Sequence, residues 1–463
     1  MKRIKHMKRL SQSMIEGPLL GGMIRYTIPI ILTGVLQLLF NAADLVVVGQ
    51  FCGSNAVGAV GATGAITSLM VNFFVGISVG VGVTIAHALG GRNDVAAHRT
   101  VHTALPVALI SGVILTIVGV TFSGKFLEMM DTPEKILPLS TIYMQIYFGG
   151  VVFNMVYNFC ASILRAAGET KKPLCYLMIS GIINVLLNIV FVTVLHMNVA
   201  GVALATVISQ AISAVLVVTE LIRRQDACHL DLKKMRIYKE QLLKFLQLGV
   251  PAGIQNSLFS ISNVIIQSSI NSFGELVIAG NAAGQNLDAF VYVAMNAFYQ
   301  AAINYVGQNA GAGKFDRIKR IFWLSNISAT VTGVLLGGVL YTFGRPLLSI
   351  YINDSDMAIE YGMIRLAGVG LPYFLCGVME ATVGCIRGLG SSVAPMLISI
   401  IGVCGVRLMW IFTVFQIPQF HTQAGLYLSY PASWIATSLL QAVVFTIALK
   451  RHKKAAAAML ESI

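Results

Sequence analysis

Three acidic side chains stand inside long apolar stretches of this sequence. Of its 19 acidic residues, Asp44, Asp288 and Glu380 lie well within hydrophobic runs. A charge at the centre of a lipid bilayer costs about 3 kcal/mol or more, so an ionisable residue retained there marks a functional site by default. The chemistry available to such a carboxyl group is the binding and release of a proton, or the coordination of a small cation.

The first candidate site surrounds Asp44. Asn184 and Asn188 are four residues apart, hence on one face of a helix, and Thr206 follows on the next apolar run. Counting the helical rise places all four oxygen-bearing side chains in the outer half of the membrane. They predict a hydrogen-bonded proton site or an oxygen-lined sodium site. The alternative is that Asp44 is structural and satisfied by the neighbouring amides.

The second half of the chain offers a more ambiguous set. Asp288 and Arg407 fall near mid-depth, and Glu380 lies about 10 Å from the inner end of its helix. Because a buried, unpaired guanidinium is very costly, we expect Arg407 to pair with one of the two acids and leave the other free. We choose Glu380 as the free acid. It is predicted either to couple to an ion or to serve as a cleft or structural residue.

A substrate cleft is a further possibility in this half. Tyr292 and Met295, with Tyr299 one turn further on, could present aromatic and thioether groups to an organic cation. A stripe at this spacing is also typical of ordinary packing. Gln255 and Asn256 could line the same cleft, together with Asp288 and Arg407. Pro29 and Pro251 interrupt two corresponding helices and predict kinks.

Composition identifies the elements that must position these residues. The chain is 56% hydrophobic and 11% charged over 463 residues, with a mean hydropathy of +0.78. A soluble domain carries about 25% charged residues, so most of this chain must lie in lipid. The apolar runs predict an all-α polytopic membrane protein with twelve transmembrane helices, near 23–48, 56–88, 97–122, 138–164, 173–195, 199–222, 241–272, 276–310, 318–344, 361–386, 394–416 and 423–449.

The basic residues indicate the orientation. Of the 32 Lys and Arg, 27 lie up to the start of the first predicted helix or at segments that follow an even number of helices. Since cytoplasmic loops collect positive charge, we expect a multi-pass protein of the cytoplasmic membrane with both termini in the cytoplasm. The net charge of +13 has the same origin and does not indicate nucleic acid. The seven cysteines are scattered and suggest neither disulfides nor a metal site.

The chain also repeats itself. "ILRAAGETKKP" (163–173) and "CIRGLGSSVAP" (385–395) share Arg, Gly and Pro at the same spacing, 222 residues apart, and the same shift takes Pro29 to Pro251. This offset predicts two homologous six-helix lobes, 1–222 and 245–463, joined by a basic linker at 223–244. An even number of helices in each lobe makes the repeats parallel, with a central cleft between them that suits alternating access.

Several segments together resemble the multidrug and toxic compound extrusion (MATE) transporters. They are "IPIIL" (28–32), "NAADLVVVGQF" (41–51), "GVPAGIQNSLFSISN" (249–263), "GQNAGAG" (307–313), "AGVALATVIS" (200–209) and the two repeated elements. The resemblance implies export of organic, often cationic, compounds in exchange for protons or sodium. Asp44, Asn184 and Thr206 match a cation site of the family, whereas Asn188 replaces a frequent aspartate. The usual glutamate of the seventh helix is absent, with Gln255 in that neighbourhood.

Other functions remain to be weighed. A lipid or lipid-linked oligosaccharide flippase of the same superfamily would favour several deep arginines, and Arg407 is the one that the sequence places deeply. A channel would need a ring of pore-lining polar residues, and an intramembrane enzyme a reactive constellation such as HExxH or paired catalytic aspartates in adjacent helices. Neither feature is present, nor is a phosphate-binding loop, so an ion gradient must supply the energy. We therefore expect a secondary antiporter that is not an enzyme, needs no cofactor and functions as a monomer.

Overall fold

The computed structural model describes residues 14–352 and 355–461, and each of the twelve expected segments is helical there. The first six correspond to α2 (Leu19–Cys52), α3 (Ser54–Gly90), α4 (Asp94–Met129), α5 (Leu137–Gly149) with α6 (Val151–Ala166), α7 (Lys171–Ile189) and α8 (Asn198–Ile222). The other six correspond to α9 (Lys239–Asn271), α10 (Glu275–Gly311), α11 (Phe315–Thr342), α13 (Asp356–Arg365) with α14 (Tyr373–Gly388), α15 (Val393–Ser399) with α16 (Val406–Phe412), and α17 (Gln423–Tyr427) with α18 (Ser429–Glu461). The short α12 (Gly344–Leu348) follows α11.

The helices differ in how apolar they are. Within the described residues, nine helical segments are long and apolar enough to cross a membrane, or ten when α5 and α6, which meet at a 46° bend, are counted as one. Helices α9 and α10 do not meet this standard, although both were expected as spans. Each carries many amide and hydroxyl side chains. The two helices with the most polar groups to satisfy are therefore those that begin the second half.

The contacts divide the chain into two compact units. Unit 1 comprises Leu32–Gly253, and unit 2 comprises the described residues up to Ile31 together with those from Ile254 onward. Both boundaries lie two residues after a proline inside a helix, Pro29 in α2 and Pro251 in α9. The first helix of each half is thus shared between units at equivalent positions. The lobes 1–222 and 245–463 with their linker follow the repeat, and that division remains a prediction.

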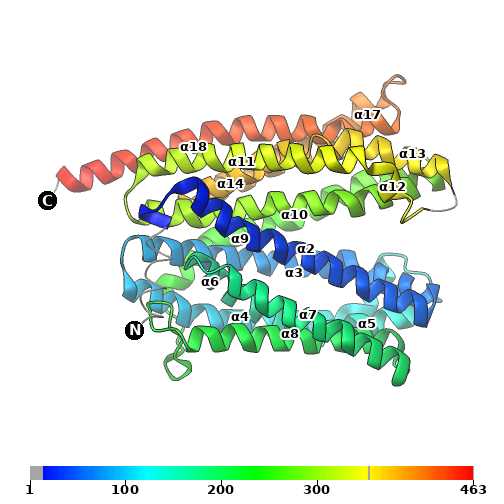
Figure 1. Ribbon diagram of the computed structural model, residues 1–463, viewed down its shortest axis with the longest axis horizontal. Helices are drawn as coiled ribbons and strands as arrows, with labels where there is room; N and C mark the ends of the chain where they lie inside the picture. Colours follow the sequence, from blue (N-terminus) through cyan, green and yellow to red (C-terminus); the bar gives the residue numbers. More distant parts are fainter. Residues whose placement is uncertain (1–13, 353–354, 462–463) are drawn as a thin grey trace. The chain divides into compact units, whose positions relative to one another are not determined.

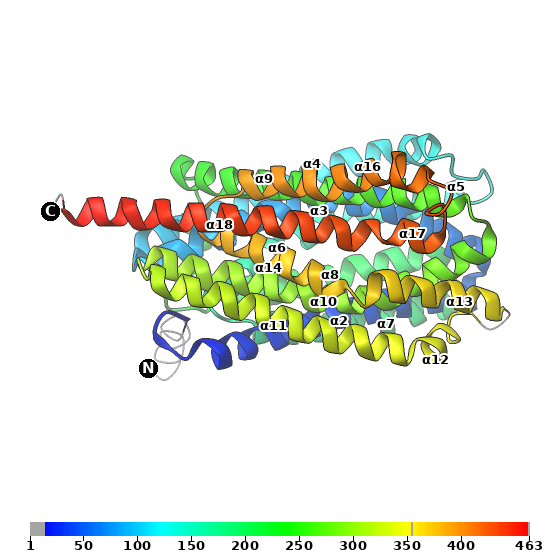
Figure 2. The same cartoon turned by 90° about the horizontal axis from the view of Figure 1, so that it is seen from above.

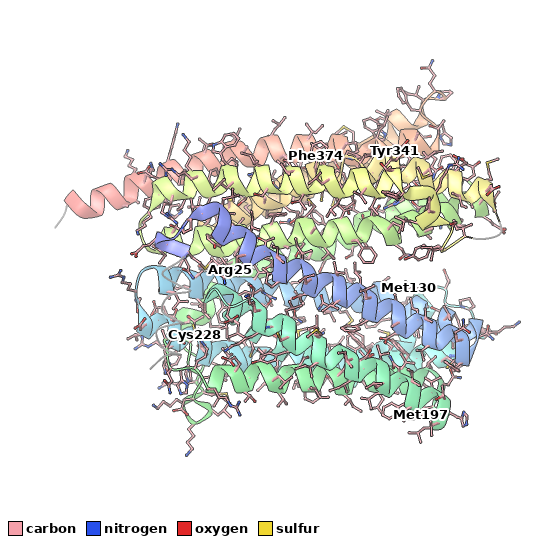
Figure 3. The ribbon with its side chains drawn as sticks, in the orientation of Figure 1. Arg25, Met130, Met197, Cys228, Tyr341 and Phe374 are labelled. Atoms are coloured by element: carbon pink, nitrogen blue, oxygen red, sulfur yellow. The ribbon has the colours of Figure 1, made fainter. Side chains whose placement is uncertain are left out.

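Unit 1 is packed through glycines that let helix backbones approach closely. A methyl group on Gly80 of α3 would lie 2.1 Å from the carbonyl oxygen of Phe245 in α9, so only a glycine fits. Helices α7 and α8 lie side by side in Figure 1. Figure 3 places Met130 and Met197, which follow α4 and α7, at one end of this unit and Cys228, which follows α8, at the other. Successive helices of unit 1 therefore run in alternating directions.

Unit 2 is built around α10 and α14. A methyl group on Gly384 of α14 would lie 2.7 Å from the carbonyl oxygen of Tyr299 in α10, which brings these two backbones together. The start of α2 packs here as well, where the rings of Tyr26 and Tyr305 meet edge to face at 5.7 Å. Helix α18 runs without a break to the end of the described chain (Figure 2).

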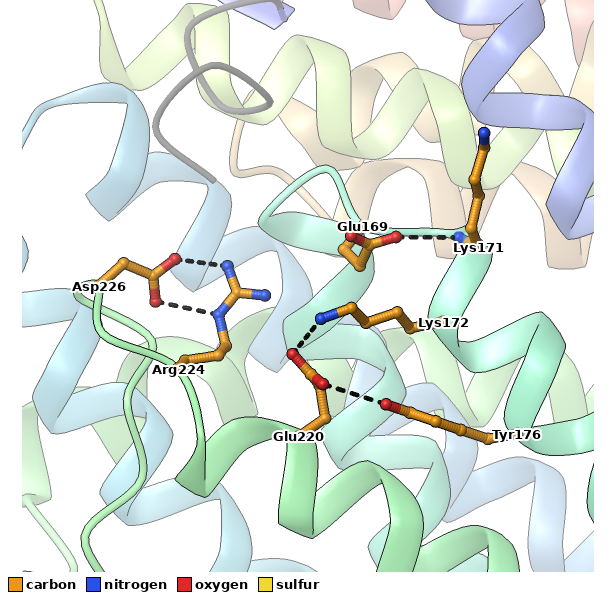
Figure 4. Close-up of polar contacts among 7 residues, drawn as sticks. All are labelled: Glu169, Lys171, Lys172, Tyr176, Glu220, Arg224 and Asp226. Atoms are coloured by element: carbon orange, nitrogen blue, oxygen red, sulfur yellow. Dashed lines mark hydrogen bonds and ion pairs between the residues drawn. The ribbon is translucent and has the colours of Figure 1, made fainter. Parts of the chain in front are cut away.

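The basic linker after α8 is ordered against unit 1. Arg224 forms a two-pronged ion pair with Asp226, and Glu220 at the end of α8 accepts bonds from Lys172 and Tyr176 (Figure 4). Burial raises the pKa of the Cys228 thiol in this linker to about 12, so this cysteine stays protonated and unreactive at neutral pH. The Arg224–Asp226 and Lys172–Glu220 ion pairs thus hold the start of the linker against the ends of α7 and α8.

Candidate functional site

The structure joins three of the four residues predicted around Asp44. The Asn188 amide donates to Asp44 Oδ1, and it also lies 3.4 Å from Asn184 Oδ1. Both asparagines are buried, whereas Asp44 is half-buried. The Oδ1 of Asn188 has no hydrogen-bond partner among the described residues. A carboxylate beside an unsatisfied amide oxygen can accept a proton or contribute oxygen ligands to a cation.

Thr206 does not complete this cluster. Its hydroxyl donates to the carbonyl of Val202, one turn earlier in α8, at 3.0 Å. Tyr143 of α5, which the sequence did not indicate, lies close enough to Asp44 to interact with its charge. The candidate site in unit 1 is therefore Asp44 with Asn184 and Asn188, and with Tyr143 nearby.

One glycine explains why Asp44 meets these asparagines. The ring of Phe40 in α2 packs on Gly181 of α7, where a methyl group would lie 1.8 Å from a ring carbon. Asp44 follows Phe40 by four residues, so the two lie on one face of α2. Asn184 and Asn188 follow Gly181 by three and seven residues, so these three lie on one face of α7. The close approach at Gly181 therefore sets the distance between the two sides of the site.

We predict that Gly181→Ala lowers the free energy of unfolding by about 1–3 kcal/mol, because the added methyl group overpacks the contact with the Phe40 ring. The measurement is thermal unfolding of the purified protein in detergent. Gly61→Ala in α3 is the matched control, since nothing lies within 4 Å of the added methyl group there. Equal melting temperatures for the two variants would contradict this account of the α2–α7 contact.

In unit 2, Asp288 has a different partner from the one expected. Arg365 lies 2.8 Å from Asp288 Oδ2 through Nη2, and its Nε also donates to that oxygen at 3.0 Å. Both side chains are buried. The prediction that Arg407 pairs with this acid is therefore wrong. Arg365 lies inside the helix expected at 361–386, and that position together with Asp288's need for a cation could have revealed the pair.

The Arg365–Asp288 pair belongs to a larger buried network. Asn281 Oδ1 accepts from Arg365 Nη1 at 2.8 Å and from the Tyr427 hydroxyl at 2.7 Å, and Asn281 donates to Gln267 at 3.1 Å. Gly284 makes room for Arg365, because a methyl group there would lie 2.9 Å from Arg365 Cδ. The network ties α9, α10, α13 and α17 together.

Arg407 contacts aromatic rings and a hydroxyl group rather than an acid. Its Nε donates to Ser433 Oγ at 3.1 Å, and its guanidinium carbon lies 4.1 Å from the centre of the Tyr430 ring. The Trp434 ring lies 5.9 Å away. A desolvated cation–π contact of this kind contributes about 2 kcal/mol. No ion pair joins Arg407 to an acidic residue within the described chain.

Glu380 lies near another buried arginine. Arg387 donates from Nη1 to the Tyr299 hydroxyl and from Nη2 to Gln255 Oε1, the latter at 2.8 Å. Glu380 interacts electrostatically with Arg387, and no hydrogen bond or ion pair is formed by the Glu380 carboxyl group within the described residues. Gln255 and Tyr299, predicted as cleft residues, are thus brought together by Arg387. In the sequence, Arg387 stands out only as the arginine of the second repeated element at 385–395.

The remaining predicted residues are more scattered. Met295 is fully buried, with its sulfur against Gly377, in a hydrophobic cluster of unit 2. Tyr292 is exposed and meets the Tyr373 ring at 6.5 Å, and Asn256 is half-buried. These observations give Met295 a packing environment and leave Tyr292 accessible from outside its unit.

The fold and site define a class of protein: a polytopic membrane protein with polar and charged clusters buried inside its helical units. The family model described as MatE matches residues 29–190 and again 251–413. The second match begins 222 residues after the first, which confirms that the two halves are repeats. The chain belongs to the MatE family of multidrug efflux transporters, and it is a transporter rather than an enzyme.

Individual relatives agree with this membership. The "Probable multidrug resistance protein YoeA" of Bacillus subtilis is 28% identical over 428 residues, covering 90% of this chain and 91% of the relative. An "FAD transporter" of Shewanella oneidensis is 25% identical over 334 residues, covering 70% and 73%. A crystal structure of a MATE protein in the bent conformation is 17% identical, with a TM-score of 0.88, and covers 96% of this chain and 99% of that one. The twelve-helix fold expected from the sequence is therefore confirmed.

Proposed function

We propose that this chain exports small organic cations across the cell membrane in exchange for protons or sodium ions, by alternating access. It acts as a monomer, without a cofactor, and with both termini in the cytoplasm. Asp44, Asn184 and Asn188 form the ion-coupling site in this proposal, with Thr206 at its edge and Glu380 as a second coupling acid. Pro29 and Pro251 provide the bends at which the first helix of each half changes shape.

One observation carries the proposal. The half-buried Asp44 carboxylate is bonded to the Asn188 amide, whose own oxygen has no described partner. A lone carboxylate held by neutral amides gains or loses a full charge when an ion binds, with no fixed cation to compensate it. That change is large in a low-dielectric surrounding, which gives an ion gradient a means of shifting the balance between two conformations.

A second candidate substrate is an anionic organic molecule, such as a nucleotide or a lipid-linked sugar phosphate. The observation that favours it is the burial of three arginines in unit 2, Arg365, Arg387 and Arg407, of which the latter two have no acidic ion-pair partner among the described residues. The sequence argument against a flippase counted Arg407 alone, and the burial of three arginines in unit 2 weakens that argument. The FAD transporter among the relatives is in keeping with such a substrate.

The experiment that tests these alternatives uses inside-out membrane vesicles containing the protein. An acidic lumen or a sodium-loaded lumen is imposed separately, and accumulation of ethidium and of FAD is followed. Ethidium uptake under one gradient supports the cation exporter and identifies the ion. FAD uptake without ethidium uptake favours the anionic substrate, and uptake of neither under any gradient refutes ion-coupled export of these two substrate classes.

A further inference from the structure

We propose that Arg387 is a positioning residue that links the protonation of Glu380 to helix α9. Its guanidinium bonds Gln255 of α9 while Glu380 is neutral, and turns to Glu380 when that carboxyl group is ionised. The inference rests on the proposed function, because it gives a mechanical consequence to the titration of Glu380.

The geometry begins with the spacing on α14. Glu380 and Arg387 are seven residues apart, so they lie on one face of the helix, separated by about 10 Å of axial rise. Side chains on a helix lean toward its N-terminus, which directs the long side chain of Arg387 toward Glu380. Glycines on either side of Arg387 hold this face against α10: methyl groups on Gly384 and Gly388 would lie 2.7 Å and 2.9 Å from the carbonyl oxygens of Tyr299 and Ile303.

Arg387 is a buried cation whose hydrogen-bond donors are not all used. Its side chain is 2% exposed, yet its hydrogen-bond partners, Tyr299 and Gln255, are both neutral. Its Nε has no partner within the described residues. A hydrogen bond between ionised groups is about twice as strong as one between neutral groups. An ionised Glu380 therefore competes successfully with Gln255 for the guanidinium, whereas a protonated one does not.

Gln255 is the residue through which a change in the hydrogen bonding of Arg387 affects helix α9. It is 2% exposed, and it lies four residues after Pro251, so it is one turn beyond the position where α9 lacks a backbone hydrogen bond. Loss of Arg387 leaves the Gln255 oxygen unsatisfied, which is unfavourable in the interior and weakens the packing of this part of α9 within unit 2. The protonation of one acid on α14 is thereby converted into a change in the attachment of α9.

Other groups around this pair are few and are compatible with the exchange. Tyr292 and Tyr299 of α10 and Cys376 of α14 interact electrostatically with Glu380. On α11, Ser325 contacts Cys385 of α14, and Asn326 accepts a hydrogen bond from Thr382 of α14. Neither of these α11 residues carries a charge. The charges of Arg407 and Asp288 interact electrostatically with Cys376. Asp288 is already paired with Arg365. Arg387 is thus the cation placed to respond to Glu380.

The test follows amide hydrogen exchange in residues 254–262 of the full-length protein in detergent, at pH 5.5 and pH 8.5, corrected for the intrinsic pH dependence of exchange. We expect exchange in this segment to rise at least threefold at high pH in the wild type. Glu380→Gln should hold it at the slow rate, and Gln255→Leu and Arg387→Gln should hold it at the fast rate at both pH values. Arg387→Lys should restore part of the pH dependence, because it keeps the charge.

Gln441→Leu is the matched control. Gln441 is a buried amide of the same unit that bonds Ser399 rather than Arg387, so its exchange pattern should remain that of the wild type. A pH dependence that survives in Glu380→Gln or in Arg387→Gln would overturn the inference. Gradient-driven transport in vesicles is measured in parallel: its absence in the wild type, together with the expected exchange pattern, would reject the proposed function while leaving the Arg387 exchange intact.

Discussion

Asp44→Asn should reduce gradient-driven substrate accumulation in inside-out vesicles at least tenfold, while the protein still reaches the membrane in normal amount. The substituted amide has the shape of the carboxyl group and can still accept a hydrogen bond from Asn188. The packing of Phe40 on Gly181 is untouched. What the variant loses is the ability to change charge, and this change is what lets an ion gradient act on the protein.

Two measurements separate loss of coupling from loss of binding. Equilibrium binding of ethidium to purified Asp44→Asn should stay within about threefold of the wild type, since the substitution removes an ion site and leaves the rest of the fold in place. The control is Glu128→Gln, which neutralises an exposed acid in the last turn of α4 and should leave transport unchanged. Full accumulation by Asp44→Asn under either gradient would remove Asp44 from the coupling mechanism.

The helices were predictable because each is a long apolar run bounded by charged or turn-forming residues. Even α9 and α10, which are too polar to meet the standard for a span, were predicted as runs at 241–272 and 276–310. Helices α3 and α10 are each a single unbroken helix of 37 residues, longer than the runs predicted at 56–88 and 276–310. At 1.5 Å per residue each is about 55 Å long.

The residues of the candidate site were predictable only where their spacing along one helix determines that they lie on the same face. Asn184 and Asn188 share a face of α7, and counting the rise placed them at the depth of Asp44. The bond that Thr206 makes to its own backbone depends on a hydroxyl rotamer, which no periodicity reveals. The partner of Asp288 depends on how closely α10 and α13 approach. Gly284 permits that approach, and a sequence pattern does not show which helix a glycine faces.

The Arg365–Asp288 pair should show the largest effect on stability. Both side chains are buried, and removing one partner leaves an uncompensated charge in the interior, which costs about 3–5 kcal/mol. We therefore expect Arg365→Leu and Asp288→Leu each to lower strongly the melting temperature of the detergent-solubilised protein. The double variant should recover most of the loss, because replacing both charges of a buried pair by apolar groups is often close to neutral.

The same double variant decides whether Asp288 has a role beyond this pair. If Asp288 serves only to neutralise Arg365, the double variant should be stable and should transport ethidium at close to the wild-type rate. If Asp288 also contacts a cationic substrate, as the sequence suggested, the double variant should be stable but inactive. A double variant no more stable than either single variant would contradict the charge-compensation account, and would assign the stability instead to the bonds that Asn281 makes with Arg365 and Tyr427.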